Sequence, residues 1–406
     1  MDRIEDKFLR IHLDYNNTII YTLLFLMSIN FMNMFYKIFL LFVLCSVLIG
    51  GKYIIPRKEI LRMAFLFLFS AIYIYVYNQM GERNISKAII LFSFPSMFWI
   101  GYSQRIDLKK WDLPIWVVVI GLGLHGAMNF LNNRTLLVTS EVRSTVDVWT
   151  KSEWIMTGQI SLFIMLAGVT YYIFSALKMQ DKPFLKITLI CLWTVGMLYN
   201  AFGSTRTVVY ASIINVILCI AVTIIKFHYD LKRQLKYMFY VLLVIFIIYM
   251  VYSLNLFGIK TWISDLPLFR RIIRLNAVNK VSDLSTRQGQ ITAALSQIFV
   301  HPWGKYTMRF SSTLDFIHNT WLNIAYTTGI IPAFLFFVYC ILSLKDAFCI
   351  VKYGSDWKAA LLILGIFSSI MTYWCLEPVC EAVPSVISLF CFIHGYAMAC
   401  FEKGAL

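Results

Sequence analysis

Charged residues are scarce in this chain. Asp, Glu, Lys and Arg make up 14% of its 406 residues, whereas soluble domains carry roughly 25%. Hydrophobic residues account for 60%. A fold surrounded by water could not hide so much apolar surface, because a large part of any protein's surface stays exposed after folding. The composition therefore excludes soluble domains and predicts one membrane domain over residues 1–406.

The sequence also lacks the motifs of several function classes. It contains no GxxxxGK[ST] and no strand–GxGxxG–helix pattern, so no nucleotide site is predicted. No His, Cys or acidic group has the spacing of metal ligands, and we expect neither a metal nor a cofactor. Nine cysteines lie mostly in apolar runs. Only Cys375 and Cys380 share a short polar turn, which leaves a disulfide and two free thiols both open.

Apolar runs recur along the chain, and most are close to the length of about 20 residues that a helix needs to cross a bilayer. We therefore predict an all-α fold, a polytopic bundle of about twelve transmembrane helices. The predicted spans are residues 17–34, 36–50, 60–79, 88–102, 114–131, 154–177, 187–203, 207–225, 237–256, 318–344, 360–376 and 384–400.

The basic residues of the short connecting segments favour one orientation. With the N-terminus in the cytoplasm, the segments on that side carry three times as many lysines and arginines as the short outer segments. This is the bias of the positive-inside rule, and it predicts that both termini are cytoplasmic. It also accounts for the net charge of +15, which therefore does not indicate a nucleic-acid partner.

One outer loop is long. Residues 257–317, between the ninth and tenth predicted helices, hold eight basic and three acidic side chains. A cationic loop on the outer face indicates an anionic ligand. Its amphipathic segment 261–280 is expected to lie in the membrane interface and to offer Arg270, Arg271 and Arg274 to the substrate.

A second short helix is predicted in this loop. Ser285 is an N-cap candidate, and the helix continues through Ile298. Pro302 and Gly304 end it. This places Arg287 in the first turn of the helix.

Three polar sites share one predicted depth, the outer membrane surface, although they are far apart in sequence. They are Ser204 with Arg206, Arg287, and His318 with Asn319. Arg binds phosphate oxygens bidentately, so two of them could hold a pyrophosphate and stabilise it as a leaving group. His is the usual general base near neutral pH, and Asn319 could orient it or bind a sugar.

Simpler interpretations of these side chains stay open. Arg206 could extend to the interface from a helix end, and Arg287 could be a solvated loop charge. His318 could cap an interfacial helix. His301, beside Pro302, is expected to be structural. The remaining histidines, among them His125 and His394 inside predicted helices, look incidental to any site.

Two carboxylates, Glu377 and Glu381, flank Pro378 in the last outer turn. They could bind a substrate hydroxyl or pair with an arginine, or they could be turn charges at a helix end. We include Glu377 among the candidate substrate-binding residues.

The order of these motifs resembles the O-antigen polymerase and O-antigen ligase superfamily. Its pattern is Ser/Thr-Arg at a helix start, then Arg before an apolar helix that ends in His-Pro-x-Gly, then His-Asn-x-x-Leu followed by Gly. The corresponding residues are Thr205-Arg206, Arg287, His301-Pro302-Trp303-Gly304, His318-Asn319-Thr320-Trp321-Leu322 and Gly329-Ile330. The motifs cover about residues 200–345, and Ile291 stands where the family often has Trp.

The resemblance implies a metal-independent, inverting glycosyltransferase of the GT-C type in the bacterial inner membrane, with a periplasmic active site. It implies that Arg206 and Arg287 hold the pyrophosphate of an undecaprenyl-pyrophosphate-linked glycan and that His318 activates the acceptor hydroxyl. Expected partners are the lipid-linked glycan as donor and acceptor, membrane lipids and a chain-length regulator protein.

Three functions remain open at this point. A polymerase transfers the glycan to another lipid-linked repeat unit, and the divergent, aromatic-rich sequence outside the motifs favours it. A ligase transfers the glycan to lipid A–core. A flippase for the same lipid would also suit twelve helices, but it should carry ionisable groups near the bilayer midplane, and few are predicted there.

Overall fold

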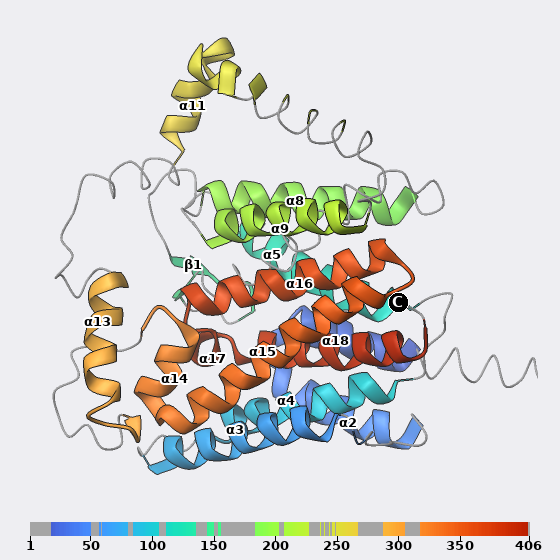
Figure 1. Ribbon diagram of the computed structural model, residues 1–406, viewed down its shortest axis with the longest axis vertical. Coiled ribbons are helices and arrows are strands. Elements are labelled where there is room, and N and C mark those ends of the chain that lie inside the picture. The colour runs from blue at the N-terminus through green and yellow to red at the C-terminus, as the bar shows by residue number, and fades with distance from the viewer. Residues whose placement is uncertain are drawn as a thin grey trace, which may run out of the picture.

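The computed structural model describes residues 18–49, 57, 59–79, 84–104, 111–134, 144–149, 153–155, 183–202, 207–226, 249–266, 287–304 and 317–404, together with residues 236, 239, 243, 246 and 247. Helices dominate this part of the chain (Figure 1). They begin with the apolar helix Thr18–Ser28, η1 (Phe31–Asn33), α2 (Phe35–Ile49), α3 (Ile60–Gln79), α4 (Ile85–Ser103) and α5 (Leu113–Asn132). They continue with α8 (Pro183–Phe202), α9 (Thr207–Lys226), η2 (Leu256–Gly258), α11 (Ile259–Asp265), α13 (Arg287–Ile298), α14 (Thr320–Thr328), α15 (Ile330–Tyr353), α16 (Trp357–Leu376), α17 (Val379–Ala382) and α18 (Pro384–Glu402).

Six of the described helices are long and apolar enough to cross a membrane, namely α3, α4, α5, α15, α16 and α18. These are the helices of a multi-pass membrane protein. The predicted span 154–177 lies outside the described residues except at its start, and the span 237–256 is described only in part. The number of about twelve spans therefore stays a prediction, because the described residues do not cover every predicted span.

The fold is not purely helical. Residues Ser144–Val146 (β1) and Glu153–Ile155 (β2) pair as a short antiparallel ribbon after α5. Asn133, directly after α5, exchanges hydrogen bonds with the backbone of Val146, at 2.7 and 2.8 Å. The side-chain amide of Asn133 at the end of α5 thus holds the ribbon in place. The hydrophobic periodicity of the sequence does not indicate such a ribbon.

The predicted span 318–344 is wrong in its continuity and its length. The structure breaks it at Gly329, whose φ of 104° favours glycine, and extends the second part, α15, to Tyr353. The His-Pro-x-Gly segment packs against this break. The N–H of Ile330 donates to the carbonyl of Pro302 at 2.9 Å, and a Cβ on Gly304 would lie 2.7 Å from the nitrogen of Gly329.

This contact fixes the direction of α13 relative to α14. The end of α13 leads into Pro302 and Gly304, which lie at the end of α14, and the two helices pack side by side (Figure 1). Ala294 and Ile298 are buried. The starts of α13 and α14, where Arg287 and His318 stand in the sequence, therefore lie at the same end of the helix pair.

The spanning helices alternate between two ends of the bundle. Lys87 at the start of α4 pairs with Glu381 in α17, whereas Tyr102 at the end of α4 bonds to Glu402 at the end of α18. We call these the His318 end and the Glu402 end. The starts of α4 and α14 lie with α17 at the first, and the ends of α4 and α18 lie at the second. In Figure 1 they lie at the left and the right.

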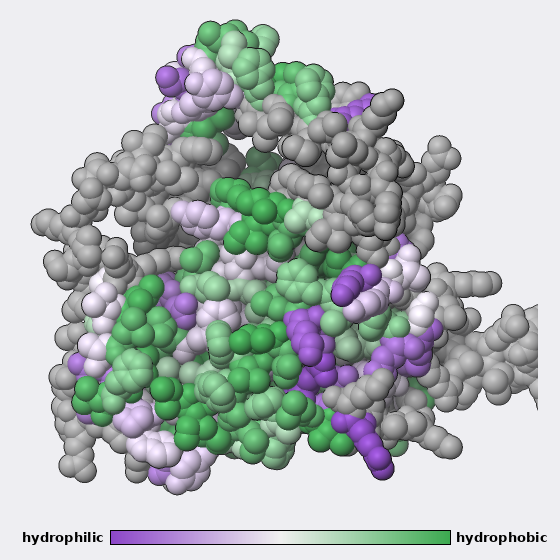
Figure 2. Space-filling model, in the orientation of Figure 1, coloured by the Kyte–Doolittle hydropathy of each residue, from purple (hydrophilic) through white to green (hydrophobic). Residues whose placement is uncertain are grey.

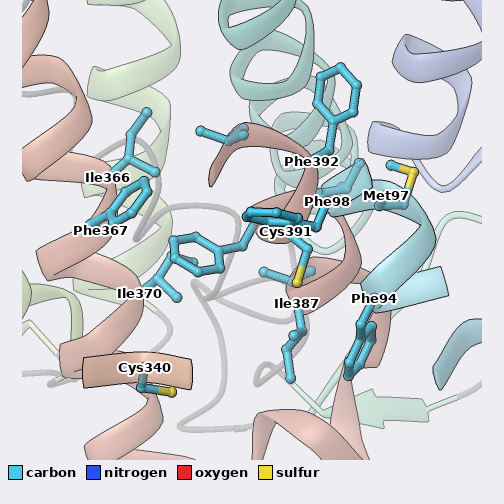
Figure 3. Packing of buried hydrophobic residues seen from close by; sticks show 14 of the residues in the cluster. Phe94, Met97, Phe98, Cys340, Ile366, Phe367, Ile370, Ile387, Cys391 and Phe392 are labelled. Atoms are coloured by element: carbon cyan, nitrogen blue, oxygen red, sulfur yellow. The ribbon is translucent and has the colours of Figure 1, made fainter. Parts of the chain in front are cut away.

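Helices α4 and α18 form the closest helix pair. A Cβ on Gly101 would collide with the carbonyl of Phe392, and one on Gly395 would collide with the carbonyl of Phe98. Small residues at such crossings let membrane helices approach closely. Figure 3 shows the aromatic and aliphatic side chains that pack around this pair, including Phe94 and Cys391.

Large apolar side chains of α2, α3 and α15 remain exposed, for example Leu48, Phe67 and Phe334. In Figure 2, hydrophobic residues cover the middle of the visible face, and hydrophilic residues concentrate toward its right side. An apolar surface of this extent on a helix bundle is suited to lipid contact.

Ionisable side chains meet inside the bundle toward the Glu402 end. Arg62 of α3 forms a bidentate ion pair with Asp346 of α15, and it also contacts Glu59 at 3.1 Å. Asp346 bonds in turn to Nε2 of His394 at 3.0 Å, and His394 is fully buried. The expectation that His394 is incidental is wrong: it joins α18 to α15 through a charged network. The likewise buried His125 pairs with Asp147 at 2.9 Å.

A smaller polar contact joins α9 to α16. Asn215 donates to Ser369 at 2.5 Å and accepts from Ser368, and all three side chains are buried. Interhelical hydrogen bonds in membranes contribute about 0.6 kcal/mol on average and up to about 2 kcal/mol.

We expect Asn215→Leu to lower the free energy of unfolding in detergent by about 1 kcal/mol, because the two serines of α16 lose their partner across the helix interface. The control is Ile217→Leu, at an exposed position of the same helix. An unchanged unfolding midpoint for Asn215→Leu would show that the contact is dispensable.

Candidate functional site

The start of α14 is bound to the turn after α16 by three consecutive residues. His318 contacts Glu377, Asn319 donates to the carbonyl of Cys375 at 3.0 Å, and the hydroxyl of Thr320 donates to the carbonyl of Glu377 at 2.6 Å. The Thr320 hydroxyl also accepts from the N–H of Val379 at 3.1 Å. The two segments therefore form one rigid unit although about 60 residues separate them.

His318 and Glu377 form the chemical centre of this unit. Nδ1 of His318 lies 3.0 Å from Oε2 of Glu377, and the other carboxylate oxygen accepts from the hydroxyl of Thr207 at 3.1 Å. Glu377 and Thr207 are buried, whereas the His318 side chain is 27% exposed. A carboxylate at Nδ1 favours the tautomer with the proton on that nitrogen, so Nε2 carries the lone pair of a base.

Thr207 is the first residue of α9 and follows Arg206 directly in the sequence. Arg206 and Ser204 themselves lie outside the described residues, as do Arg270, Arg271 and Arg274. The hydrogen bond from Thr207 nevertheless brings the start of α9 to the His318–Glu377 pair. The first and third sequence motifs thus meet at Glu377.

The second motif approaches from α13. Arg287 is the first residue of that helix, at the same end of the bundle as His318. Thr207, next to the first motif, and His318 of the third motif therefore bond to the same carboxylate, and the helix of the second motif packs against α14.

Asn319 has a structural partner at both ends of its side chain. Its oxygen caps α14 by accepting from the N–H of Leu322 at 2.9 Å, and its nitrogen donates to the carbonyl of Cys375. The structure thus shows Asn319 fixing the backbone next to His318 against the end of α16. Neither bond involves the imidazole of His318, so Asn319 affects the position of that ring through the backbone.

A second polar group lies beside this pair, on the same turn. Glu381 in α17 accepts from the amide of Asn323 in α14 at 3.1 Å and faces the ammonium of Lys87 in α4 at 3.6 Å. The Lys87 ammonium lies 3.8 Å from the centre of the Tyr77 ring of α3. Residues of α3, α4, α14 and α17 therefore meet around the Lys87–Glu381 pair.

The cysteines of this turn take no part in a disulfide. Cys375 and Cys380 are both free thiols. Burial raises the pKa of Cys380 to about 12, so this thiol is protonated at neutral pH and is a poor nucleophile. Within the described part of the chain, no group of three or more His, Cys, Asp or Glu side chains could hold a metal ion.

The sequence does not indicate the partners of the candidate base. Glu377 is a candidate for substrate binding from the sequence, whereas the structure shows both of its oxygens bonded to protein groups. No role is predicted for Thr207 or Asn323. The sequence does indicate that Glu377 needs a polar partner, because an acid beside a proline at the end of an apolar helix must bond to another polar group or to water. Nothing in the sequence indicates that His318, among the histidines of the chain, is the partner of Glu377.

No protein-family model matches this chain, and no curated protein matches it either.

Proposed function

We propose that this protein is an O-antigen polymerase, a metal-independent inverting glycosyltransferase of the bacterial inner membrane. It would join undecaprenyl-pyrophosphate-linked repeat units at the periplasmic face. The observation that carries the proposal is the His318–Glu377 pair, at which the starts of α9 and α14 meet beside α13. A base with a buried carboxylate partner is suited to deprotonating a hydroxyl.

The reaction is a single displacement. Nε2 of His318 accepts the proton of the acceptor hydroxyl while its oxygen forms a bond to the anomeric carbon of the donor. The bond between that carbon and the pyrophosphate oxygen breaks, and its electron pair leaves with the pyrophosphate. Attack opposite to the leaving group inverts the anomeric centre. Undecaprenyl pyrophosphate leaves as an anion.

Within this proposal Glu377 is a positioning residue. It fixes the ring of His318 through Nδ1 and stabilises the imidazolium that forms when Nε2 takes the proton. Arg206 and Arg287 are assigned to the pyrophosphate for two reasons. Arg206 directly precedes Thr207, which bonds to Glu377, and Arg287 begins α13, which packs against α14. Guanidinium groups also stabilise developing phosphate charge. Ser204, Arg270, Arg271 and Arg274 remain proposed substrate contacts.

The orientation supports the same assignment. On the predicted topology, the short segments on the side of the His318 end carry a third as many Lys and Arg residues as the segments on the side of the Glu402 end. The positive-inside rule therefore favours the outer, periplasmic side for the pair and the cytoplasm for both termini. The donor lipid would enter laterally, with its tail among the apolar faces of the bundle.

One observation favours a second candidate, a flippase for the same lipid. The Arg62–Asp346–His394 network lies within spanning helices, where transporters place ionisable groups. An aromatic layer separates it from His318, however. The rings of Phe336 and Trp374 lie 5.0 Å apart, as do those of Phe69 and Phe336. Among the described residues, this layer sets apolar rings between the two polar groups, which favours chemistry at one face.

The test uses purified full-length protein in proteoliposomes with the lipid-linked repeat unit isolated from the cells of origin. We expect a ladder of longer lipid-linked products from wild-type protein and a loss on the order of 10³-fold with His318→Ala. Addition of lipid A–core as a separate acceptor tests the ligase. Transbilayer movement of a labelled lipid without a new glycosidic bond would overturn the proposal in favour of the flippase.

A further inference from the structure

The Lys87–Glu381 pair is a further partly exposed charged group at the His318 end. Side-chain exposure is 15% for Lys87 and 32% for Glu381. An exposed ion pair contributes little to stability, about 0–1 kcal/mol. Yet four separate elements contribute to it, with Asn323 and Tyr77 as the other neighbours. Such convergence is more than helix packing requires, because α3, α4, α14 and α17 already contact one another or α18 through buried side chains.

The chemistry of the pair is that of a hydroxyl-binding site. A carboxylate offers about four lone-pair directions and an ammonium three donors. Asn323 uses one direction of Glu381, and Lys87 faces the other oxygen. The remaining directions can accept from and donate to a ligand with many hydroxyl groups. The two formal charges cancel, so the site is suited to a neutral polyol and not to a pyrophosphate.

The position of the pair links it to the base. Glu381 and Glu377 are four residues apart on one turn, so their Cα atoms are separated by at most about 14 Å. Both are bonded to α14 or the residues that lead into it, Glu377 through His318 and Thr320, and Glu381 through Asn323. The distance and direction from the base to Glu381 are therefore fixed by a shared, hydrogen-bonded frame.

We propose that Lys87 and Glu381 form the acceptor-sugar subsite, which binds hydroxyl groups of the acceptor glycan other than the one that attacks. The subsite holds the acceptor so that a single hydroxyl reaches Nε2 of His318, and it thereby determines which linkage forms. This inference rests on the proposed transferase function. It separates the two substrates: the acceptor sugar lies at Glu381, and the donor pyrophosphate lies at the arginines.

Kinetics with the full-length protein test the subsite. The probe acceptor is the repeat-unit oligosaccharide released from its lipid, which cannot act as a donor, and its concentration is varied at a fixed level of the lipid-linked donor. We expect Glu381→Gln, which keeps the shape and a bond to Asn323, to raise the acceptor KM at least tenfold while the donor KM stays within twofold. Lys87→Met should act in the same direction. Glu402→Gln, a glutamate at the opposite end of the bundle, is the control.

Product analysis supplies a readout that a purely structural role would not change. Linkage analysis of the Glu381→Gln product is expected to show glycosidic bonds to more than one acceptor hydroxyl, where the wild type forms one. An unchanged acceptor KM together with a single linkage would overturn the subsite and leave the transferase intact.

Binding without turnover distinguishes the two proposals. The oligosaccharide released from the lipid by mild acid serves as the probe in saturation-transfer NMR with His318→Ala protein. Contact that depends on Glu381, in a chain whose wild type forms no glycosidic bond, would leave Lys87 and Glu381 as a glycan-binding site and would overturn the transferase together with the acceptor role of the site. Absence of contact with both His318→Ala and wild-type protein would overturn the subsite, whatever the outcome of the transfer assay.

Discussion

Replacing Glu377 by Gln is expected to lower turnover on the order of 10³-fold with little change in the KM of either substrate. The amide keeps the volume of the side chain and can still bond to Thr207, but it carries no charge. It can neither hold the Nδ1 proton of His318 as a carboxylate does nor stabilise the imidazolium. The measurement is the steady-state rate of glycan transfer in proteoliposomes.

A double-mutant comparison shows whether Glu377 acts through His318. If it does, the His318→Ala/Glu377→Gln protein is no slower than His318→Ala alone, because a unit that is already disabled cannot be disabled again. Thr207→Val, which removes the other bond to Glu377, should cost less than about tenfold. Multiplicative losses in the double variant would show that Glu377 serves the fold or the substrate directly, and would contradict its assignment.

The sequence predicts the spanning helices closely where their ends coincide with changes in polarity. The prediction 60–79 matches α3, and 114–131 and 384–400 differ from α5 and α18 by at most two residues at each end. Hydrophobicity determines these helices because each must satisfy its own backbone in the bilayer. The same criterion fails for 318–344. A chain that breaks at Gly329 inside an apolar run keeps the same hydropathy.

The sequence predicts a common depth for the residues of the site, but it does not predict the bonds between them. Loop charges place His318 and Glu377 on one face, and the structure brings these two residues together. Whether His318 and Glu377 bond to each other depends on how each helix is rotated about its axis. The composition of the segments does not determine this rotation. Asp346 shows the same limit. The predicted helix ends at residue 344 and leaves this acid in an inner segment, whereas α15 continues past it. Within a helix, a buried acid requires partners, and Arg62 and His394 supply them.

Replacing Asp346 by Ala is expected to destabilise the bundle by about 3–5 kcal/mol, because it leaves the guanidinium of Arg62 and the imidazole of His394 without their shared partner in a region of low dielectric constant. Only 3% of Asp346 is exposed, so water cannot replace the carboxylate without opening the contact between α3 and α15. Unfolding in mixed detergent micelles, followed by tryptophan fluorescence, measures the loss.

A second variant separates the cost of leaving Arg62 and His394 without Asp346 from the net contribution of the whole network to the free energy of unfolding. Asp346→Leu combined with Arg62→Met and His394→Phe replaces the three members of the network by apolar groups of similar size, and it is made in a Glu59→Gln background because Glu59 is the other acidic partner of Arg62. Buried ion pairs are often no more stabilising than well-packed hydrophobic residues, so we expect the triple variant to recover most of the stability. Recovery would show that the network specifies how α3, α15 and α18 fit together and supplies little net energy. A triple variant as unstable as Asp346→Ala would instead show that the charged network is itself the main bond between these helices at the Glu402 end.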